Sequence, residues 1–197
     1  MRIVLRGGLE IEDPLDVTVK FVQAYPGYDS RDSQPGSFDE SDLRHANRGG
    51  ARISAAEIAA ILERRGRIER ALRSIAPEAS LAEDSIPWRS LTRLFDAFAD
   101  ISGIGFSKMT KALHPKRRAL IPMLDSVVQS YLATDEPKAP FAERATTLVR
   151  SYKQDLDRNL AALRQVQRDL VSRGHSSLSE VRILDLLVWS AYAPTAR

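Results

Sequence analysis

The 197-residue chain contains no cysteine. Disulfides are therefore excluded, and so are iron–sulfur clusters and metal sites built on thiolates. The three histidines, His45, His114 and His175, lie far apart and lack the close spacing typical of metal ligands. From these absences we expect a protein that holds neither a metal ion nor another cofactor.

Long hydrophobic runs are missing as well. No apolar stretch approaches the length of a membrane span, and the apolar start at residues 1–5 is too short for a signal peptide. We therefore expect a cytoplasmic monomer with no membrane partner. The hydrophobic content of 43% and the charged content of 28% are those of an ordinary globular protein. The net charge of +3 is compatible with a nucleic-acid partner.

Several enzyme fingerprints are also absent. The chain has no phosphate-binding P-loop and no G-x-S-x-G nucleophile elbow. The G-I-G at residues 103–105 lacks the third glycine and the preceding strand of a dinucleotide-binding motif. Chemistry that depends on these motifs therefore finds no support in the sequence.

Apolar residues recur at helical spacing along most of the chain. Ser54 opens an S-x-x-E capping box, which predicts the start of a helix whose apolar stripe runs to Ile75. A second stripe covers residues 88–101. A third defines a long amphipathic helix over residues 148–170, which should end at Gly174.

The remaining segments complete the prediction of an all-α fold. Residues 181–192 are apolar on most sides and predict a buried helix. The stretch 17–22 fits a helix or a strand equally well. Clusters of proline, glycine and polar residues predict loops over residues 25–38 and 134–140. We therefore predict one helical domain over residues 1–197, built as two lobes.

The stretch over residues 101–128 is the most informative part of the chain. Gly103 and Gly105, in S-G-I-G, permit a tight turn between two helices that residues with a Cβ would resist. Such a turn leaves backbone N–H groups and the start of the next helix facing outward, which suits an anion. A set of cations follows the turn: Lys108, Lys111, Lys116, Arg117 and Arg118. A phosphate backbone is therefore the expected ligand.

Two motifs in this stretch, I-S-G-I-G-F-S-K-M and I-P-M-L-D-S-V-V, resemble the signature of the helix-hairpin-helix DNA glycosylases. That signature reads L-P-G-(I/V)-G-x-x-T-A, then a spacer, then P-x-x-D-x-x-V. The adenine-mismatch branch is the most similar, because it has a serine where Ser107 stands, and Asp125 follows 18 residues later as the pattern requires. About thirty residues match closely, and the rest of the chain matches only in architecture.

The resemblance implies an enzyme that binds double-stranded DNA across the groove between two lobes and flips a base out of the duplex. It also implies that Asp125 is the catalytic carboxylate. Cleavage of the N-glycosidic bond builds positive charge on the sugar, which an anion stabilises, and the same anion can orient the attacking water. From the sequence alone, an N-cap of a helix that begins at Ser126 is the more frequent role for Asp125, and the two roles are compatible.

Ser107 and Lys108 bear on the type of reaction. Glycosylases of this kind that also cut the strand use an amine at the position of Ser107 to form a Schiff base with the sugar, and serine cannot do so. Lys108, the other catalytic candidate, is displaced by one residue, which rotates its side chain by about 100° around the helix. We therefore expect a monofunctional enzyme that releases the base and leaves an abasic site.

The resemblance also suggests which residues contact DNA. They are the hairpin, the cations after it and a plug from the loop 45–52: Gly103, Ile104, Gly105, Ser107, Lys111, Lys116, Arg117, Arg118, Asn47 and Arg48. The alternatives are a solvated charge run and a glycine-rich turn. Trp88 and Trp189 lie on apolar stripes and are expected in the core, whereas Tyr25 and Tyr28, in a loop, are freer to stack on a base.

The leading hypothesis is thus a small DNA glycosylase, without the iron–sulfur cluster that many members hold on four cysteines. The main alternative is a non-catalytic DNA-binding protein that keeps the hairpin, since Ser102 replaces the usual proline and Lys111 falls near a usually small position. A third hypothesis is an adaptor protein that binds a partner through the apolar face of the helix predicted over residues 148–170. The sequence does not distinguish between alkylated, oxidised, mismatched and bulky phage-modified bases as the target. It also leaves open whether the biological role is DNA repair or phage defence.

Overall fold

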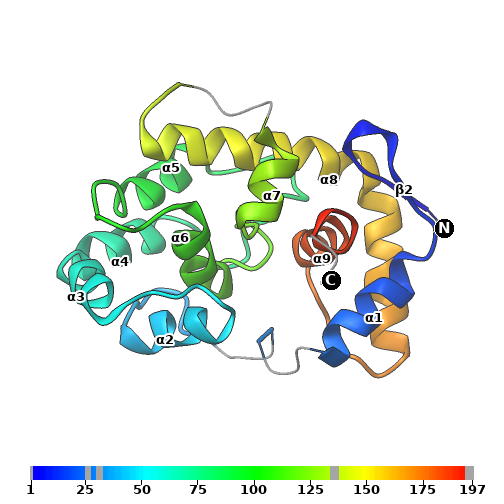
Figure 1. The fold of residues 1–197 in the computed structure, drawn as a ribbon, viewed down its shortest axis with the longest axis horizontal. Helices are drawn as coiled ribbons and strands as arrows, with labels where there is room; N and C mark the ends of the chain where they lie inside the picture. Colours follow the sequence, from blue (N-terminus) through cyan, green and yellow to red (C-terminus); the bar gives the residue numbers. More distant parts are fainter. Residues whose placement is uncertain (1, 25–27, 30–32, 134–137, 194–197) are drawn as a thin grey trace.

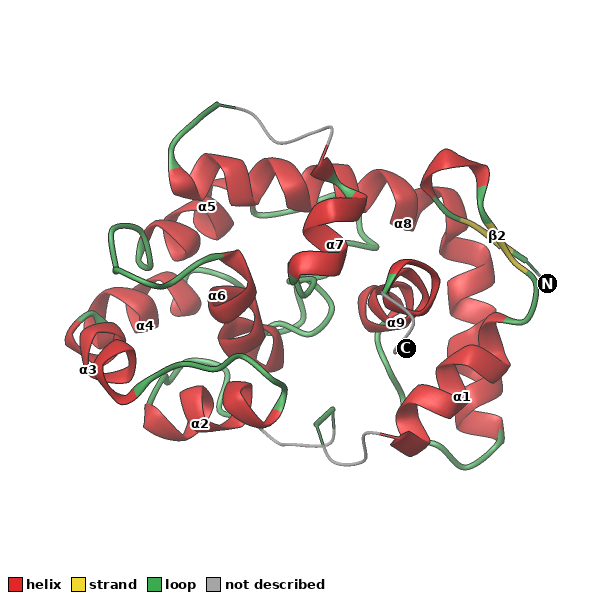
Figure 2. Cartoon of the chain, viewed as in Figure 1, coloured by secondary structure: helices red, strands yellow, loops and turns green. Residues whose placement is uncertain are grey.

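The computed structural model describes residues 2–24, 28–29, 33–133 and 138–193. The structure is 62% helix and 2% strand, which confirms a mostly helical fold (Figure 2). The helices are α1 (Pro14–Ala24), α2 (Glu40–Arg48), α3 (Ala55–Glu63), α4 (Arg65–Arg73), α5 (Trp88–Asp96), α6 (Phe106–Leu113), α7 (Ser126–Tyr131), α8 (Phe141–Ser172) and α9 (Glu180–Tyr192). The shorter elements are an antiparallel pair and two 3-10 turns: β1 (Ile3–Val4), β2 (Glu10–Ile11), η1 (Arg6–Gly8) and η2 (His114–Lys116).

Local signals in the sequence account for several helix ends. Ser54 is the N-cap of α3 and exchanges hydrogen bonds with Glu57 in the predicted capping box. Gly174 lies just beyond the C-cap of α8 with a φ of 79°, and its N–H donates to the Val171 carbonyl. Both predicted ends are confirmed. Residues 17–22 belong to α1, so the open choice between helix and strand there resolves to helix.

The single helix predicted over residues 54–75 is divided in two. α3 ends at Glu63 and α4 begins at Arg65, with a break at Arg64 (φ −97°, ψ 7°). Apolar side chains on both sides of the break, Ile61 among them, still face the core. The apolar spacing therefore predicted burial correctly, but it did not predict the break, because both segments keep the same face inward.

Figure 1 shows two groups of helices with α7 between them. One group holds α2, α3, α4, α5 and α6, and the other holds α1, α9, the β-pair and the C-terminal part of α8. Both described ends of the chain lie in the second group, where α1 packs against α8 and α9. Buried apolar residues from the two groups form one continuous core.

Helix α8 connects the two groups. Near its start, Thr146 shares a hydrogen bond of 2.9 Å with a threonine of α5. Further along, the Tyr152 hydroxyl donates to the Val181 carbonyl of α9 at 2.7 Å, and Asn159 bonds both the N–H and the carbonyl of Val4 on β1.

Although α8 has 32 residues, neither it nor another helix in the described ranges combines the length and apolar character needed to cross a membrane.

Candidate functional site

A cavity of about 560 Å³ lies between the two groups of helices. Its volume is within the usual range of small-ligand pockets. Helices α1, α2, α6, α7 and α9 contribute to its wall, together with the segments at residues 28, 49–50 and 123–125. The lining includes two carboxylates, three cations and three aromatic rings: Asp125, Asp185, Arg48, Lys111, Arg182, Phe21, Tyr28 and Trp189.

Asp125 is the N-cap of α7 and lines the cavity. Its backbone is extended, and Oδ1 accepts hydrogen bonds from the N–H groups of Val127 and Val128 at 3.0 Å each. These bonds fix the direction of the carboxylate. The predicted N-cap is therefore confirmed. Because no group in the described part of the chain bonds Oδ2, that oxygen remains for a ligand.

Asp185, on α9, is the second carboxylate of the cavity. The residue is only 3% exposed, and its Oδ2 accepts from the N–H of Met123 at 3.1 Å, which ties α9 to the segment that leads into Asp125. Its Oδ1 has no hydrogen-bond partner among the described groups. Burial raises the pKa of Asp185 to about 7, against the opposing effects of the Arg182 guanidinium and the Met123 N–H. The cavity therefore combines a helix-capped carboxylate with one that takes up a proton near neutral pH.

The aromatic rings line the cavity in different ways. Tyr28 stacks on His45 with ring centroids 4.8 Å apart, and it lies against Gly49, where an added Cβ would come within 2.4 Å of the ring. His45 and Gly49 thus both restrict the Tyr28 ring. Trp189 meets Phe21 edge to face at 5.2 Å and stays 38% exposed. The expectation that Trp189 belongs to the core was wrong, and a planar ligand in the cavity can reach this ring.

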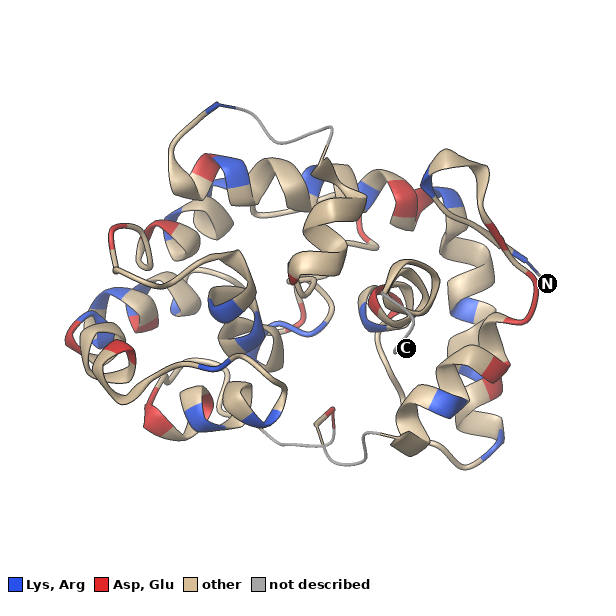
Figure 3. Ribbon diagram, viewed as in Figure 1, with Lys and Arg blue, Asp and Glu red and all other residues tan. Residues whose placement is uncertain are grey.

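Two cations that line the cavity, Arg48 and Lys111, have no ion-pair partner within the described ranges, and neither has Arg52 in the loop after α2. Burial lowers the pKa of Lys111; the negative charge of Asp125 opposes this effect, and the charges of Arg182 and Arg52 add to it. Figure 3 shows basic positions at the end of α2, in the loop that follows it and on α6. A positively charged edge therefore adjoins the Asp125 carboxylate.

Asn47 holds the loop after α2 in place. Its Nδ2 donates to the Ile53 carbonyl at 2.8 Å, and its Oδ1 accepts from the Ile53 N–H at 2.6 Å. Between these ends Gly50 and Arg52 adopt positive φ angles of 77° and 55°. The expectation that Asn47 bonds an orphaned base is therefore corrected, because its amide is already used by this loop. Arg48 is exposed and lines the cavity, so it stays a candidate.

The turn between α5 and α6 has the conformation that its glycines predict. Gly103 has a φ of 78°, and an added Cβ would lie 2.2 Å from the carboxylate of Glu57. Gly105 is the N-cap of α6, and the space around its Cα is open. Ile104 between them is buried. None of these three turn residues lines the cavity.

Along α6 the structure separates three candidates that are close in sequence. Lys108 donates to Glu57 at 2.6 Å, so its amine is paired and does not line the cavity. Ser107 is half-buried and also lies outside the lining. Lys111 follows Ser107 by four residues, which is about one helical turn, and is the lysine that reaches the cavity.

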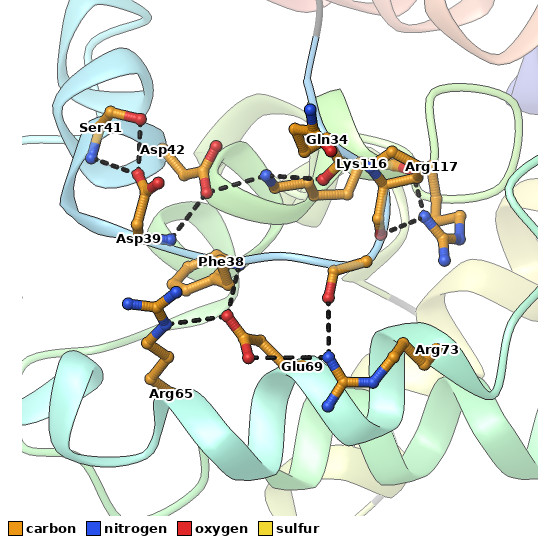
Figure 4. Close-up of polar contacts among 12 residues, drawn as sticks. Gln34, Phe38, Asp39, Ser41, Asp42, Arg65, Glu69, Arg73, Lys116 and Arg117 are labelled. Carbon is orange, nitrogen blue, oxygen red and sulfur yellow. Dashed lines mark hydrogen bonds and ion pairs between the residues drawn. The ribbon is translucent and has the colours of Figure 1, made fainter.

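Lys116 and Arg117 are interior residues, which corrects the expectation that they contact DNA phosphates. Lys116 is 5% exposed and pairs with Asp42 at 2.8 Å. The guanidinium of Arg117 donates to two carbonyls at the end of α4, at 2.5 and 2.6 Å. It also donates to one in the loop before α2, at 2.9 Å (Figure 4). Helix ends leave such carbonyls without partners, and a buried guanidinium can supply several donors at once. Arg118 is half-buried, and its carbonyl accepts from Ser179.

Sequence reasoning missed Arg182 and Asp185. Both lie in α9, within the run that the sequence marked as a buried helix. The sequence did contain a signal for them, namely two charged residues within an apolar helix. Such side chains are rarely buried without an ion-pair partner or a functional role. Arg182 is accounted for by Asp29 at 2.8 Å and by the Tyr28 ring, whose centroid is 5.5 Å from the guanidinium carbon. Asp185 is not accounted for in this way.

The remaining expectations concern residues away from the cavity. Trp88 packs against the core, as expected, with the Arg150 guanidinium 4.3 Å from its ring centroid. Tyr25 and part of the predicted loop 134–140 lie outside the described residues. Across the described part, no group of three or more potential ligands is placed to hold a metal ion.

The sequence comparison identifies a family for this chain. Residues 17–192 match the model of the Family of unknown function (DUF6308). No curated protein and no solved structure matches. The matched range contains every cavity residue named above. The chain therefore belongs to this family.

Proposed function

We propose that this protein is a DNA glycosylase that hydrolyses the N-glycosidic bond of a damaged or modified base and leaves an abasic site. The observation that carries the proposal is the setting of Asp125. This carboxylate is fixed by two helix N–H groups in the wall of a 560 Å³ cavity, and it stands at the distance from the glycine turn that the glycosylase signature requires.

Asp125 suits the chemistry of base release. As the bond between C1′ and the base breaks, positive charge builds on the sugar, and a fixed anion close to that charge lowers the barrier. The Oδ2 atom, which is free of hydrogen bonds in the described structure, can also orient the attacking water. Because Oδ1 is held by the helix, the carboxylate need not reorganise during the reaction.

The cavity suits an extruded base. The cavity is lined by an exposed ring, that of Trp189, and by polar groups. A flipped base needs both a ring to stack on and hydrogen bonds to its edge. In this proposal the extruded base occupies the cavity, and its sugar lies beside Asp125. Arg48, which lines the cavity from the end of α2, is the candidate for filling the gap that the base leaves.

The proposed DNA-binding surface consists of the α5–α6 turn and the edge of the cavity. The turn presents the N-terminus of α6, whose first N–H groups have no side-chain cap. Lys111, on the same helix, extends this positive surface to the cavity. Arg48, at the end of α2, continues it, and Arg52 adds a further positive charge from the loop after α2. A phosphate backbone that follows this path brings a nucleotide to Asp125.

The proposed enzyme is monofunctional. Ser107 offers no amine, and the Lys108 amine is paired with Glu57 outside the cavity lining. We therefore expect base release without strand cleavage. In the assay below, treatment with borohydride should trap no covalent adduct between protein and DNA.

The test compares wild type with Asp125→Asn. Duplexes with damaged or modified bases are scored for alkali-labile abasic sites, and binding is measured to two abasic analogues, a cationic pyrrolidine and a neutral tetrahydrofuran. Wild type should release a base and should bind the pyrrolidine duplex at least tenfold more tightly, because the cation mimics the charged sugar of the transition state. Asp125→Asn should lose both properties, since asparagine keeps the N-cap but not the charge.

Asp39→Asn is the matched control. Asp39 is also a helix N-cap, on α2, and its side chain accepts from the Ser41 N–H at 2.8 Å away from the cavity lining. This variant should behave as wild type. Equal binding of both analogues by wild type, with no base released, would favour a non-catalytic DNA-binding protein, and no binding at all would favour the adaptor.

A further inference from the structure

Asp185 is a polar group of the cavity to which the proposed reaction gives no role so far. It lies on α9 across from α7, is 3% exposed and has one carboxyl oxygen, Oδ1, without a hydrogen-bond partner in the described structure. A buried carboxyl oxygen without a partner is unfavourable unless it is protonated or meets a ligand. Its other oxygen is fixed by the Met123 N–H at 3.1 Å, so the free oxygen has a defined position.

The charged and titratable groups around Asp185 come from several elements. Arg182 lies one turn earlier on α9, Tyr152 faces it from α8, and Asp125 adds negative charge from the start of α7. Arg182 pairs with Asp29 at 2.8 Å. The Tyr152 hydroxyl donates to the Val181 carbonyl at 2.7 Å, and its interaction with Asp185 lowers the pKa of that carboxyl, against the effect of burial. Burial dominates this balance and raises the pKa of Asp185 to about 7.

We infer that Asp185 is the general acid of the proposed reaction: it donates a proton to a ring nitrogen of the departing base, and the substrates are therefore bases that leave from a neutral ring. This inference rests on the proposed function. The two carboxyl groups of the cavity divide the roles between them: helix N–H groups fix the position of the Asp125 carboxylate, and burial favours the protonated form of Asp185.

The step balances without any other reactant. The bond between C1′ and the base nitrogen breaks, its electron pair stays with the base, and the proton of Asp185 passes to a ring nitrogen of that base. The oxygen of a water molecule forms the new bond to C1′ beside Asp125. The water proton passes to Asp125 and then to solvent, and the Asp185 carboxylate recovers a proton from solvent. The net reaction adds one water across the glycosidic bond.

The substrate class follows from this role. A neutral purine or pyrimidine leaves poorly as an anion, so a proton donor accelerates its release, typically by about 100-fold or more. A base that already carries positive charge, such as 7-methylguanine, leaves as a neutral molecule without a donor. Asp185 would therefore act on neutral bases with an acceptor nitrogen on the edge that faces α9.

The test measures single-turnover base release by wild type, Asp185→Asn and Asp125→Asn between pH 5 and pH 9. The duplexes carry neutral bases, for example hypoxanthine or mismatched adenine, or 7-methylguanine. For neutral bases, Asp185→Asn should lower the rate about 100-fold at pH 6 and abolish the decline of the wild-type rate above about pH 7. Release of 7-methylguanine, where it occurs, should change less than threefold. Asparagine can still accept from the Met123 N–H, and Asp157→Asn, the same change at an exposed site on α8, is the control.

The outcomes separate the two proposals. If Asp185→Asn releases neutral bases at the wild-type rate and with the wild-type pH profile, while Asp125→Asn is inactive, Asp185 is not the donor and the glycosylase proposal stands. Release of 7-methylguanine alone would also overturn the inference, because a cationic base needs no donor. If wild type releases no base from any duplex, the proposed function fails, and the role of Asp185 fails with it.

Discussion

Two polar regions of this protein differ in whether their charged groups already have partners. In the interior cluster around Lys116 and Arg117, an ion pair and several carbonyls satisfy most of the cationic hydrogen-bond donors (Figure 4). In the cavity, Lys111 and Arg48 lack partners within the described structure, and one oxygen of Asp185 does too. Satisfied groups stabilise the fold, whereas unsatisfied ones at a cavity are available to a ligand.

Arg117→Ala should have the largest effect on stability. It removes a buried guanidinium and leaves the carbonyls at the end of α4 and in the loop before α2 without donors. We expect the free energy of unfolding to fall by roughly 3–5 kcal/mol, measured by urea denaturation. Arg48→Ala, at the exposed cavity edge, should stay within about 0.5 kcal/mol of wild type. Similar losses in both variants would remove the distinction between the two regions.

The pH dependence of stability should differ in sign between the two regions. In the cavity, the pKa of Asp185 rises from 3.8 unfolded to about 7 folded, so the stabilising proton is lost as the pH rises through 7. Next to the interior cluster, burial lowers the pKa of His114 from 6.5 to about 4, so stability is lost as the pH falls from 6.5 towards 4. These two contributions oppose each other in wild type.

Asp185→Asn separates these contributions. We expect the stability of wild type relative to this variant to fall by about 2–3 kcal/mol between pH 5 and pH 8, because only wild type must ionise a buried carboxyl. The variant should be less stable at pH 5 than at pH 8, owing to His114. Urea denaturation of both proteins at the two pH values measures the difference, and parallel pH curves would contradict the buried, protonatable Asp185.

The smallest expected effect concerns the salt dependence of the proposed DNA binding. Each phosphate contact contributes about 0.9 to the slope of log affinity against log salt. The double change Arg48→Ala and Lys111→Ala should therefore reduce the slope by about 2 and weaken binding alike on all sequences. Lys116→Met, a change at an interior cation, should leave the slope of the folded protein unchanged. A reduced slope for Lys116→Met alone would mean that the interior cluster opens on binding DNA.

Features of the fold that depend on interactions between residues close in sequence were predictable from the sequence. The Ser54 cap, the end of α8 at Gly174, the positive φ of Gly103 and the N-cap role of Asp125 all follow from bonds that span no more than a few residues. The apolar stripe over residues 88–101 likewise identified α5 and its buried face. These are local rules, and they held without knowledge of the tertiary structure.

Burial of charged residues was not predictable in this way. Lys116 and Arg117 look like an exposed basic run, and only the approach of the loop before α2 and the end of α4 makes them interior. Trp189 looks like a core residue, and only its position in the wall of the cavity leaves it exposed. In each case the partner is distant in sequence, so no local pattern records it.

The sequence by itself determined a helical protein with a glycine turn and an N-capping Asp125, because caps, turns and apolar periodicity act over one or two helical turns. The tertiary structure alone decided that Asp125, Lys111 and Asp185 share one cavity. These residues come from α6, α7 and α9 and meet only when the two groups of helices pack together. The same packing buries Asp185 and raises its pKa to about 7.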